Sequence, residues 1–439
     1  MSYRILMIAP TSFFSDYGCH VRIFEEARVL QRHGHTVKIV TYYKGRDLPG
    51  LDIVRTRPTP WHPDYEVGSS RHKIAFDVLL SWTTLKMTLR FKPDVIHAHL
   101  HEGALIGSVL SAISRVPLVF DFQGSLSGEM VDHHFLDPQG RMYPFVRWLE
   151  RRIDHAPHAI LTSSHYATSL LRDEFGVDPE RVIPMPDCVD TAFFRPRAES
   201  DAADLAALRA ALGIPADRSI VVYLGLLAPY QGTDLLIEAA RHVIDQHPNA
   251  HFLIMGYPGA LGYQMMADAR GLGGHVTCLG KVLYEDAPRY LRLGDVAAAP
   301  KLSATEANGK VLNYMATGLP TVAFDMPVNR EYMREHGLYA RRGDAASLAD
   351  QLLRALNDAA LRERASLELR ARAESLFAWD DTAHRIAAVY DAVRVPHRRE
   401  RTRALQALNF GRHVGRHLSP PQHVGDLRET PPTGYDHVG

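Results

Sequence analysis

The stretch from Glu306 to Gly318 places side chains that bind polar and anionic groups close together. It reads Glu306-Ala-Asn-Gly-Lys-Val-Leu-Asn313-Tyr-Met-Ala-Thr-Gly318, and Leu-Pro and a short apolar run follow. A carboxylate accepts hydrogen bonds, the Lys310 ammonium can balance a negative charge, and the Asn313 amide both donates and accepts. The pattern predicts an acid on a loop, then a short helix, then a strand.

The loop formed by residues 9–18 is a second candidate anion site. It reads Ala-Pro-Thr-Ser-Phe-Phe-Ser-Asp-Tyr-Gly and leads from a predicted strand into a predicted helix that contains Arg22. The first amides of a helix and its dipole favour an anion. Gly18 would let a phosphate approach the backbone closely. Glycine is also common before helices for purely conformational reasons, and that alternative is equally compatible with the sequence.

Polar residues also follow the apolar run at 118–120. Asp121, Gln123 and Ser125 come first, and Glu129 is one helical turn further on. Gln123 can donate and accept hydrogen bonds but cannot titrate, so we expect it to orient hydroxyl groups and not to transfer protons.

The segment His97-Ala-His99-Leu-His101 raises the alternative of a metal site. Alternation along a strand would bring the three imidazoles to one face, but no distant fourth ligand is evident in the sequence. We therefore predict no metal and assign His99 to the lining of a ligand site.

The elements that must position these residues follow a strand–helix rhythm, which predicts parallel strands in an α/β architecture. The expected strands of a first series are 5–8, 36–41, 95–97, 118–120, 159–162 and 182–183. The rhythm restarts after residue 218 with 220–224, 251–255, 276–279, 296–299 and 321–324. Two facing doubly wound domains with a cleft between them are the simplest arrangement, with a boundary near residues 188–200.

Helices are expected at 17–34, 72–92, 345–375 and 379–393. The apolar, lysine-bearing helix at 72–92 is interpreted as packed on the sheet, with docking on a membrane as the alternative. Beyond Pro396 the chain is rich in Arg, His and Pro, and we expect a flexible tail there.

Composition limits the function classes. The 439 residues carry 50 basic and 50 acidic side chains, so bulk charge indicates no dedicated nucleic-acid partner. Cys19, Cys188 and Cys278 are scattered, which favours a reducing compartment over a disulfide framework. Without a signal-peptide pattern or a long apolar run, we expect a cytoplasmic protein that is soluble or peripheral at the inner membrane.

Ordered motifs in both halves resemble the retaining GT-B glycosyltransferases of family four, the glycosyl transferases of group 1. The resemblance covers about residues 3–393 and lies in Glu306–Val322, Asn329-Arg-Glu331, Asp187-Cys-Val-Asp190, Phe194-Arg-Pro196 and Gly34-His-Thr-Val37. It implies an acceptor-side Rossmann-like domain at 1–190 and a donor-binding one at 191–375. A crossover helix at 376–395 and a tail at 396–439 complete the expected organisation.

The resemblance also implies the chemistry. A sugar would move from a nucleotide-diphosphate donor to a hydroxyl of a glycan, glycolipid or small metabolite, with retention of configuration. The leaving diphosphate would take the acceptor proton, so neither a metal nor another cofactor is expected.

Several positions depart from the family pattern. The family has a second glutamate eight positions after the first, whereas Asn313 stands seven after Glu306. It also has an arginine and a lysine on the donor-phosphate loop, where this chain has Leu226 and Gln231. Each lost hydrogen bond to a charged group is worth about 1.5–3 kcal/mol, so other cations must compensate if a diphosphate binds. Candidates are Arg22, Lys281, Lys301 and Lys310.

On this resemblance we assign Glu306 and Gln123 to catalysis. The predicted donor site comprises Gly18, Gly225, Asn308, Gly309, Lys310, Val311, Asn313, Lys281 and Lys301. The predicted acceptor side comprises Asp121, Ser125, His99, Glu129 and Arg22. Two alternatives stay open: a GT-B enzyme with a sugar phosphate or other unusual donor, and a catalytically silent sugar- or nucleotide-binding homologue.

Overall fold

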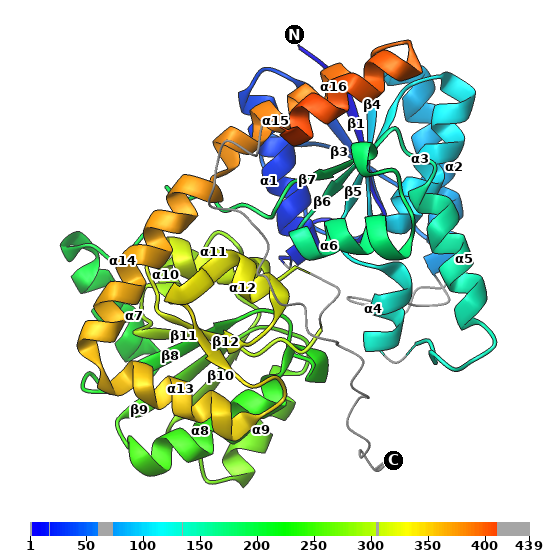
Figure 1. The fold of residues 1–439 in the computed structure, drawn as a ribbon. Helices are drawn as coiled ribbons and strands as arrows, with labels where there is room; N and C mark the ends of the chain where they lie inside the picture. Colours follow the sequence, from blue (N-terminus) through cyan, green and yellow to red (C-terminus); the bar gives the residue numbers. More distant parts are fainter. Residues whose placement is uncertain (1, 17, 60–72, 134, 304–306, 411–439) are drawn as a thin grey trace.

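The structure is a computed structural model that describes residues 2–16, 18–59, 73–133, 135–303 and 307–410. The proposed catalytic Glu306 and the tail from residue 411 onward lie outside the described residues. Figure 1 shows two α/β lobes.

The N-terminal lobe is built on a seven-stranded parallel sheet of order β3-β2-β1-β4-β5-β6-β7. Its strands are β1 (Arg4–Ala9), β2 (Thr36–Thr41), β3 (Asp52–Arg55), β4 (Val95–His99), β5 (Leu118–Phe122), β6 (Ala159–Thr162) and β7 (Val182–Pro184). Successive side chains point to opposite faces, so Ile5 and Met7 join one core and Leu6 and Ile8 the other.

Helices cover both faces of this sheet. They are α1 (Gly18–Arg32), α2 (Lys73–Phe91), α3 (Leu100–Ser114), α4 (Leu126–Asp132), α5 (Tyr143–Asp154) and α6 (His165–Ser169). Helix α1 packs on the face of Ile5, whereas α2, α3 and α5 contribute to the core on the face of Leu6.

The C-terminal lobe repeats the design with a six-stranded parallel sheet of order β10-β9-β8-β11-β12-β13. Its strands are β8 (Ser219–Leu224), β9 (Ala250–Met255), β10 (Val276–Gly280), β11 (Val296–Ala299), β12 (Thr321–Phe324) and β13 (Leu338–Ala340). Its helices are α7 (Ala202–Ala211), α8 (Thr233–Gln246), α9 (Ala260–Ala269), α10 (Ala287–Leu291), α11 (Gly309–Ala316), α12 (Pro327–Met333), α13 (Ala345–Asn357) and α14 (Ala359–Leu376).

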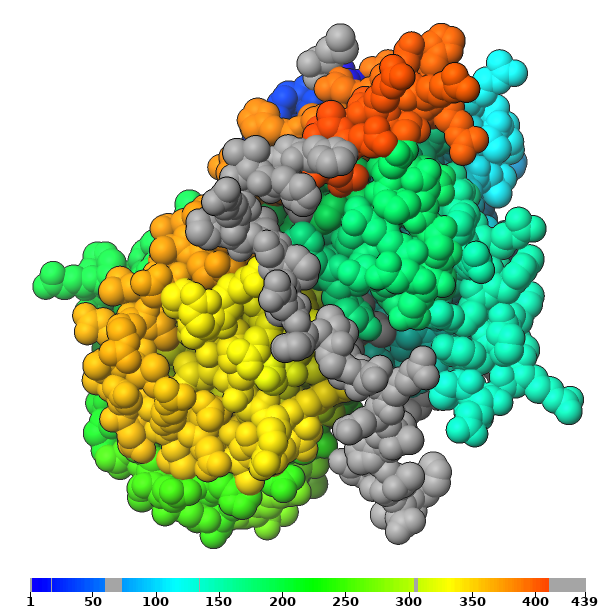
Figure 2. Space-filling view, in the orientation of Figure 1, coloured from blue at the N-terminus to red at the C-terminus, as the bar shows by residue number. Residues whose placement is uncertain are grey.

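The last helices return to the first lobe. Helix α15 (Trp379–Val393) packs beside α1, and the Tyr390 hydroxyl lies 2.7 Å from His97 Nδ1. Figure 2 shows these orange-to-red helices lying across the N-terminal lobe. The two-lobed fold with a crossover helix is therefore confirmed.

Two strands and one helix differ from the expectations. Strands β3 and β13 were not predicted. Strand β3 (Asp-Ile-Val-Arg) has charged ends and is at most half-buried, and the three residues of β13 include the half-buried Tyr339. The prediction of a flexible tail from residue 396 is wrong for Arg398–Phe410, which form helix α16. Leu405 is buried there, and Ala404 and Leu408 pack against the same core, which gives this basic segment an apolar face.

Within the described ranges, the helices lack the combination of length and apolar composition needed to span a lipid bilayer.

Candidate active site

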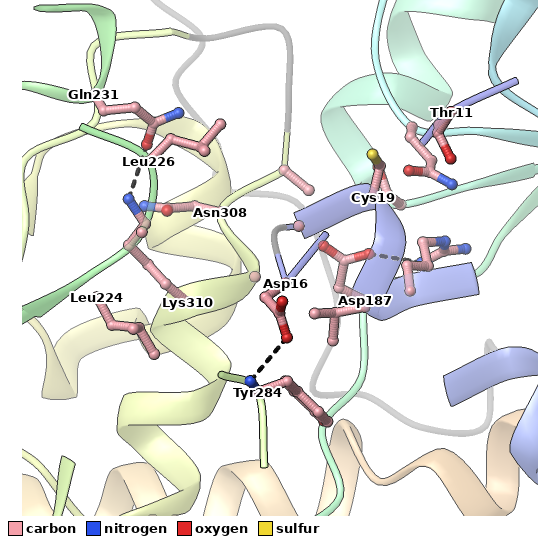
Figure 3. A pocket seen from close by; sticks show the side chains of 18 of the residues that line it. Thr11, Asp16, Cys19, Asp187, Leu224, Leu226, Gln231, Tyr284, Asn308 and Lys310 are labelled. Carbon is pink, nitrogen blue, oxygen red and sulfur yellow. Dashed lines mark hydrogen bonds and ion pairs between the residues drawn. The ribbon is translucent and has the colours of Figure 1, made fainter. Parts of the chain in front are cut away.

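A cleft of about 320 Å³ opens between the two lobes. Side chains of both lobes line it, at the carboxyl ends of the parallel strands, where ligands bind in doubly wound folds (Figure 3). Of the predicted site residues, the lining includes Gly18, Arg22, Gln123, Glu129, Gly225, Lys301, Asn308, Gly309, Lys310 and Asn313.

The N-terminal wall is organised by Arg22 on α1. Its guanidinium lies 2.7 Å from both Asp121 Oδ1 and Asp187 Oδ1, and its Nε lies 3.2 Å from Glu26 Oε1. Burial opposes ionisation of Asp121, but the adjacent Arg22 outweighs it and holds the pKa of this carboxyl well below its usual range. The charge of Arg22 is thus balanced within its own lobe, which makes it a poor substitute for a missing diphosphate cation.

The predicted catalytic Gln123 is held by the same network. Its Nε2 donates to Asp121 Oδ2 at 2.8 Å, and His99 Nδ1 lies 3.0 Å from that oxygen. His99 and Asp121 are buried behind the cleft wall, so they position Gln123. Glu129 on α4 lines the cleft directly.

Ser125 does not face the cleft as an acceptor-side residue would. It caps α4, accepting from the Gly128 amide at 3.1 Å and donating to Glu150 Oε1 at 2.7 Å. Such side-chain caps satisfy amides at helix starts, which explains a buried serine at this position.

The three histidines do not share one face, so that expectation was wrong. His97 and His99 stack at 4.7 Å between ring centroids, but α3 begins at Leu100 and turns His101 to the opposite side of the sheet. There His101 Nε2 lies 3.3 Å from Asp154 Oδ1 and 3.7 Å from Glu150 Oε1. Burial disfavours its charge, but these carboxylates prevail and raise the pKa of His101 to about 9. The protonated imidazole is thus paired with two buried carboxylates.

On the C-terminal wall, Lys310 occupies the region of the altered donor-phosphate loop. Its Nζ donates to Gln231 Oε1 at 2.8 Å and to the Tyr223 hydroxyl at 3.1 Å, and it sits 4.5 Å above the Tyr223 ring. A Cβ added at Gly225 would lie 2.7 Å from this nitrogen. The first turn of α11 thus places a cation beside the Gly225–Gly232 loop, which has leucine and glutamine at the two positions where the family has cations.

The other predicted donor residues divide into two groups. Lys301 and Asn308 line the cleft but are largely buried: Lys301 donates to the Ala307 carbonyl at 2.8 Å, and Asn308 Nδ2 donates to Asn329 Oδ1 at 2.9 Å. Val311 is fully buried in the core, and Lys281 forms an ion pair with Asp16 at 3.2 Å. Val311 and Lys281 are not among the residues that line the described cleft.

Contacts between the lobes involve residues that the sequence did not single out. Asp16 accepts from the Tyr284 amide at 3.0 Å and from Arg46 Nη2 at 2.6 Å, and Arg46 also pairs with Glu285 at 2.7 Å. Glu331 Oε2 accepts from the His165 amide at 2.8 Å. Burial raises the pKa of Glu331 to about 7, against the opposing effect of that hydrogen bond. In the sequence, Asp16 belongs to the loop of residues 9–18, whose pattern predicts an anion site and not a contact between lobes.

Cys188 lines the cleft but is unsuited to act as a nucleophile. Burial raises the pKa of its thiol to about 12, so the neutral form predominates.

Comparison with known proteins gives a consistent assignment. Residues 18–193 match the family described as Glycosyltransferase Family 4, and residues 218–358 match Glycosyl transferases group 1. The chain is 27% identical to a D-inositol 3-phosphate glycosyltransferase of Acidothermus cellulolyticus, over 88% of this chain and 90% of the relative. It is 26% identical to a phosphatidyl-myo-inositol mannosyltransferase of Mycobacterium tuberculosis, over 89% of this chain and 97% of the relative.

Solved structures share the fold. A sucrose-phosphate synthase from Thermosynechococcus elongatus superposes with a TM-score of 0.73 at 19% identity, covering 88% of this chain and 98% of that one. Anabaena HepE in complex with UDP-glucose gives a TM-score of 0.72 at 17% identity, covering 89% and 100%. Both lobes are matched in order along the chain, and the chain belongs to the group 1, family 4 glycosyltransferases of GT-B fold.

Proposed function

We propose that the protein transfers a sugar with retention from a nucleotide-diphosphate sugar to a hydroxyl group of an acceptor. The cleft between the lobes would hold both substrates, with the donor on the C-terminal wall and the acceptor on the N-terminal wall.

The position of Lys310 carries the proposal. Its ammonium lies beside Gly225 and Gln231, on the loop where the family has cations for the diphosphate. Helix α11 begins at Gly309, so its first amides add to the positive field at the cleft. A charge supplied from α11 would thus replace one supplied from the loop.

The same groups suit the departure of the diphosphate. As the bond to the sugar breaks, negative charge grows on the leaving oxygen, and fixed positive groups stabilise it without reorganisation. The leaving diphosphate would accept the acceptor proton on the face where the new bond forms, and closure of the lobes would exclude competing water. Glu306 is proposed to hold hydroxyls of the donor sugar.

The acceptor would enter along the N-terminal wall. Tyr42, Lys73, Gln123, Glu129 and His133 line the cleft there. Gln123 is fixed through Asp121, so its amide would orient a hydroxyl and not transfer its proton. Two of the similar proteins have inositol-based acceptors in their names, which makes inositol phosphate and phosphatidylinositol the first acceptors to test.

The donor site is tested by removing the charge of Lys310. Lys310→Met should weaken binding of nucleoside diphosphates by about 10- to 100-fold, because a charge-assisted contact is worth roughly 1.5–3 kcal/mol. Isothermal titration with UDP, GDP and ADP measures this. The control is Lys38→Met, since Lys38 pairs with Asp52 on the far edge of the sheet. Equal affinity in wild type and Lys310→Met would contradict the assignment.

Turnover is tested with radiolabelled nucleotide sugars and sugar phosphates against the inositol acceptors and a glycan panel. We expect transfer from a nucleotide sugar, an unchanged anomeric configuration by NMR, and loss of transfer in Glu306→Ala. Transfer from a sugar phosphate alone would favour the non-standard donor, and an inverted product would refute retention.

A further inference from the structure

The outer face of helix α2 is unusually apolar for a surface helix. Ile74, Val78 and Trp82 recur at intervals of four residues and are 72%, 65% and 58% exposed, and Leu89 continues the row. The inner face buries Phe76 and Leu80, followed by Thr84 and Thr88, whose hydroxyls donate to carbonyls of the preceding turn. A helix whose outer face meets only water has polar side chains there, so the apolar outer row is unusual.

Helix α3 repeats the pattern beside α2. Leu105, Val109 and Ile113, again four residues apart, are 45%, 56% and 69% exposed, whereas Ser111 is buried. These three side chains give α3 an apolar outer row of its own.

Helix α5, on the other side of α3, contributes aromatic side chains. Phe145 and Trp148 are each 53% exposed and stack on one another at 5.9 Å between ring centroids. Met142, directly before the helix, is 60% exposed.

These rows lie on three neighbouring helices. Helix α3 contacts both α2 and α5, and the three helices pack through their inner sides on the same face of the sheet. Figure 1 shows them along one side of the N-terminal lobe. We call this surface the apolar face; it comprises Ile74, Val78, Trp82, Leu89, Leu105, Val109, Ile113, Met142, Phe145 and Trp148.

Every exposed charged side chain of residues 73–92, 100–115 and 141–152 is basic. They are Lys86, Arg90, Lys92, Arg115, Arg141, Arg151 and Arg152. The acidic residues of these stretches are buried or half-buried, although the chain as a whole has equal numbers of acidic and basic residues. Lys86 lies 4.8 Å above the Trp82 ring and Arg152 lies 5.5 Å from that of Trp148. Basic groups with aromatic neighbours suit the boundary between lipid headgroups and acyl chains.

We propose that the apolar face docks on the surface of a lipid bilayer that contains anionic phospholipids. The apolar row would enter the outer part of the acyl region while the basic groups pair with lipid phosphates. Pairing of two copies through this face would bring their basic rims together, so charge complementarity favours an anionic membrane over a second copy.

The apolar face begins at the cleft. Lys73, which starts α2, and Leu100, which starts α3, both line the cavity between the lobes. A headgroup at the docked surface would therefore lie near the cleft opening. Docking itself does not depend on the proposed donor chemistry and is measured without any donor.

The test is binding of the full chain to vesicles of phosphatidylcholine, with and without phosphatidylglycerol. We expect the protein to co-sediment with the anionic vesicles and salt to weaken this binding, because salt screens charge pairs. Tryptophan emission should shift to the blue on binding, because Trp82 and Trp148 are exposed whereas Trp379 is buried. Trp82→Ser with Trp148→Ser should weaken binding at least about tenfold, since two large apolar contacts are lost. The double variant Lys86→Glu with Arg152→Glu should abolish the preference for the anionic lipid. It tests the basic groups of the apolar face separately from its apolar side chains.

The matched control is Leu261→Ser with Met265→Ser on α9. These residues are 75% and 62% exposed in the other lobe, so vesicle binding should not change. Absence of binding to anionic vesicles, or equal loss in the control, would overturn the proposal. Lipid-independent dimerisation that the tryptophan changes abolish, measured by sedimentation velocity, would assign the face to a second copy instead.

Discussion

Lys310 places a cation beside a loop that carries no cation at the two positions where the family has them. The loop at Gly225 to Gly232 has lost two cations, yet an ammonium from α11 lies against it and bonds to Gln231. Sequence spacing indicated Lys310 as one of four candidates. The sequence could not show which of the four cations lies at the loop, because this depends on how closely α11 approaches β8 in the fold.

A residue-scale prediction concerns His101. Its pKa of about 9 in the folded protein lies above the usual value of about 6.5, so its protonated form stabilises the fold below pH 6.5. This stabilisation is lost as the pH rises towards 9. His101→Gln should therefore destabilise the protein much more at pH 6 than at pH 9.

Thermal unfolding of wild type and His101→Gln across this range measures the effect. His242→Gln, at an exposed position on α8, serves as the control and should show no such pH dependence. A penalty for His101→Gln that is constant with pH would contradict the buried ion pair.

Residues that line the cleft were predictable from sequence where the type of side chain and its place after a strand sufficed. Gln123, Glu129, Asn308 and Lys310 all line the cleft. Ser125 and Val311 do not, because a helix cap and a core position use the same residue types as a binding loop. The sequence offered no means of separating these uses.

At the scale of elements, the longer strands were evident from their apolar runs. Strands β3 and β13 were not, because their half-buried side chains leave no apolar run, whereas the equally short β7 is fully buried and was predicted from Val182 and Ile183. Helix α16 was missed for a related reason: its mean composition is basic, and only one narrow row is apolar.

The packing of α16 gives the second prediction. Leu405→Ala should lower the free energy of unfolding by about 2 kcal/mol or more, since a buried leucine is truncated. Leu367→Ala on α14 is the control, because that side chain is 66% exposed and its loss should cost little. Denaturant unfolding compares the two; equal midpoints would mean that α16 does not pack in solution.

At the scale of the whole molecule, polar contacts join the lobes beside the aromatic contacts of Tyr284 with Phe14 and Phe24. Asp16, whose side chain is fully buried, accepts from Tyr284, Arg46 and Lys281. Tyr257 donates to the carbonyl of Ser15 in the same turn. The loop before α1 therefore works as a clasp between the lobes.

Asp16→Asn should loosen this clasp. Two cations would lose their carboxylate, so we expect a larger radius of gyration in solution and a KM for the donor raised by about tenfold. Small-angle scattering and steady-state kinetics measure these changes. Asp47→Asn, which affects an exposed ion pair within one lobe, should change neither, and an unaltered radius for Asp16→Asn would rule out the clasp.

The return of α15 has a consequence for biosynthesis. The flank of the first sheet beside α1 stays uncovered until Trp379 to Val393 have left the ribosome, and buried His97 lacks its Tyr390 partner until then. The first lobe to be translated therefore completes its packing only after the second lobe has been translated.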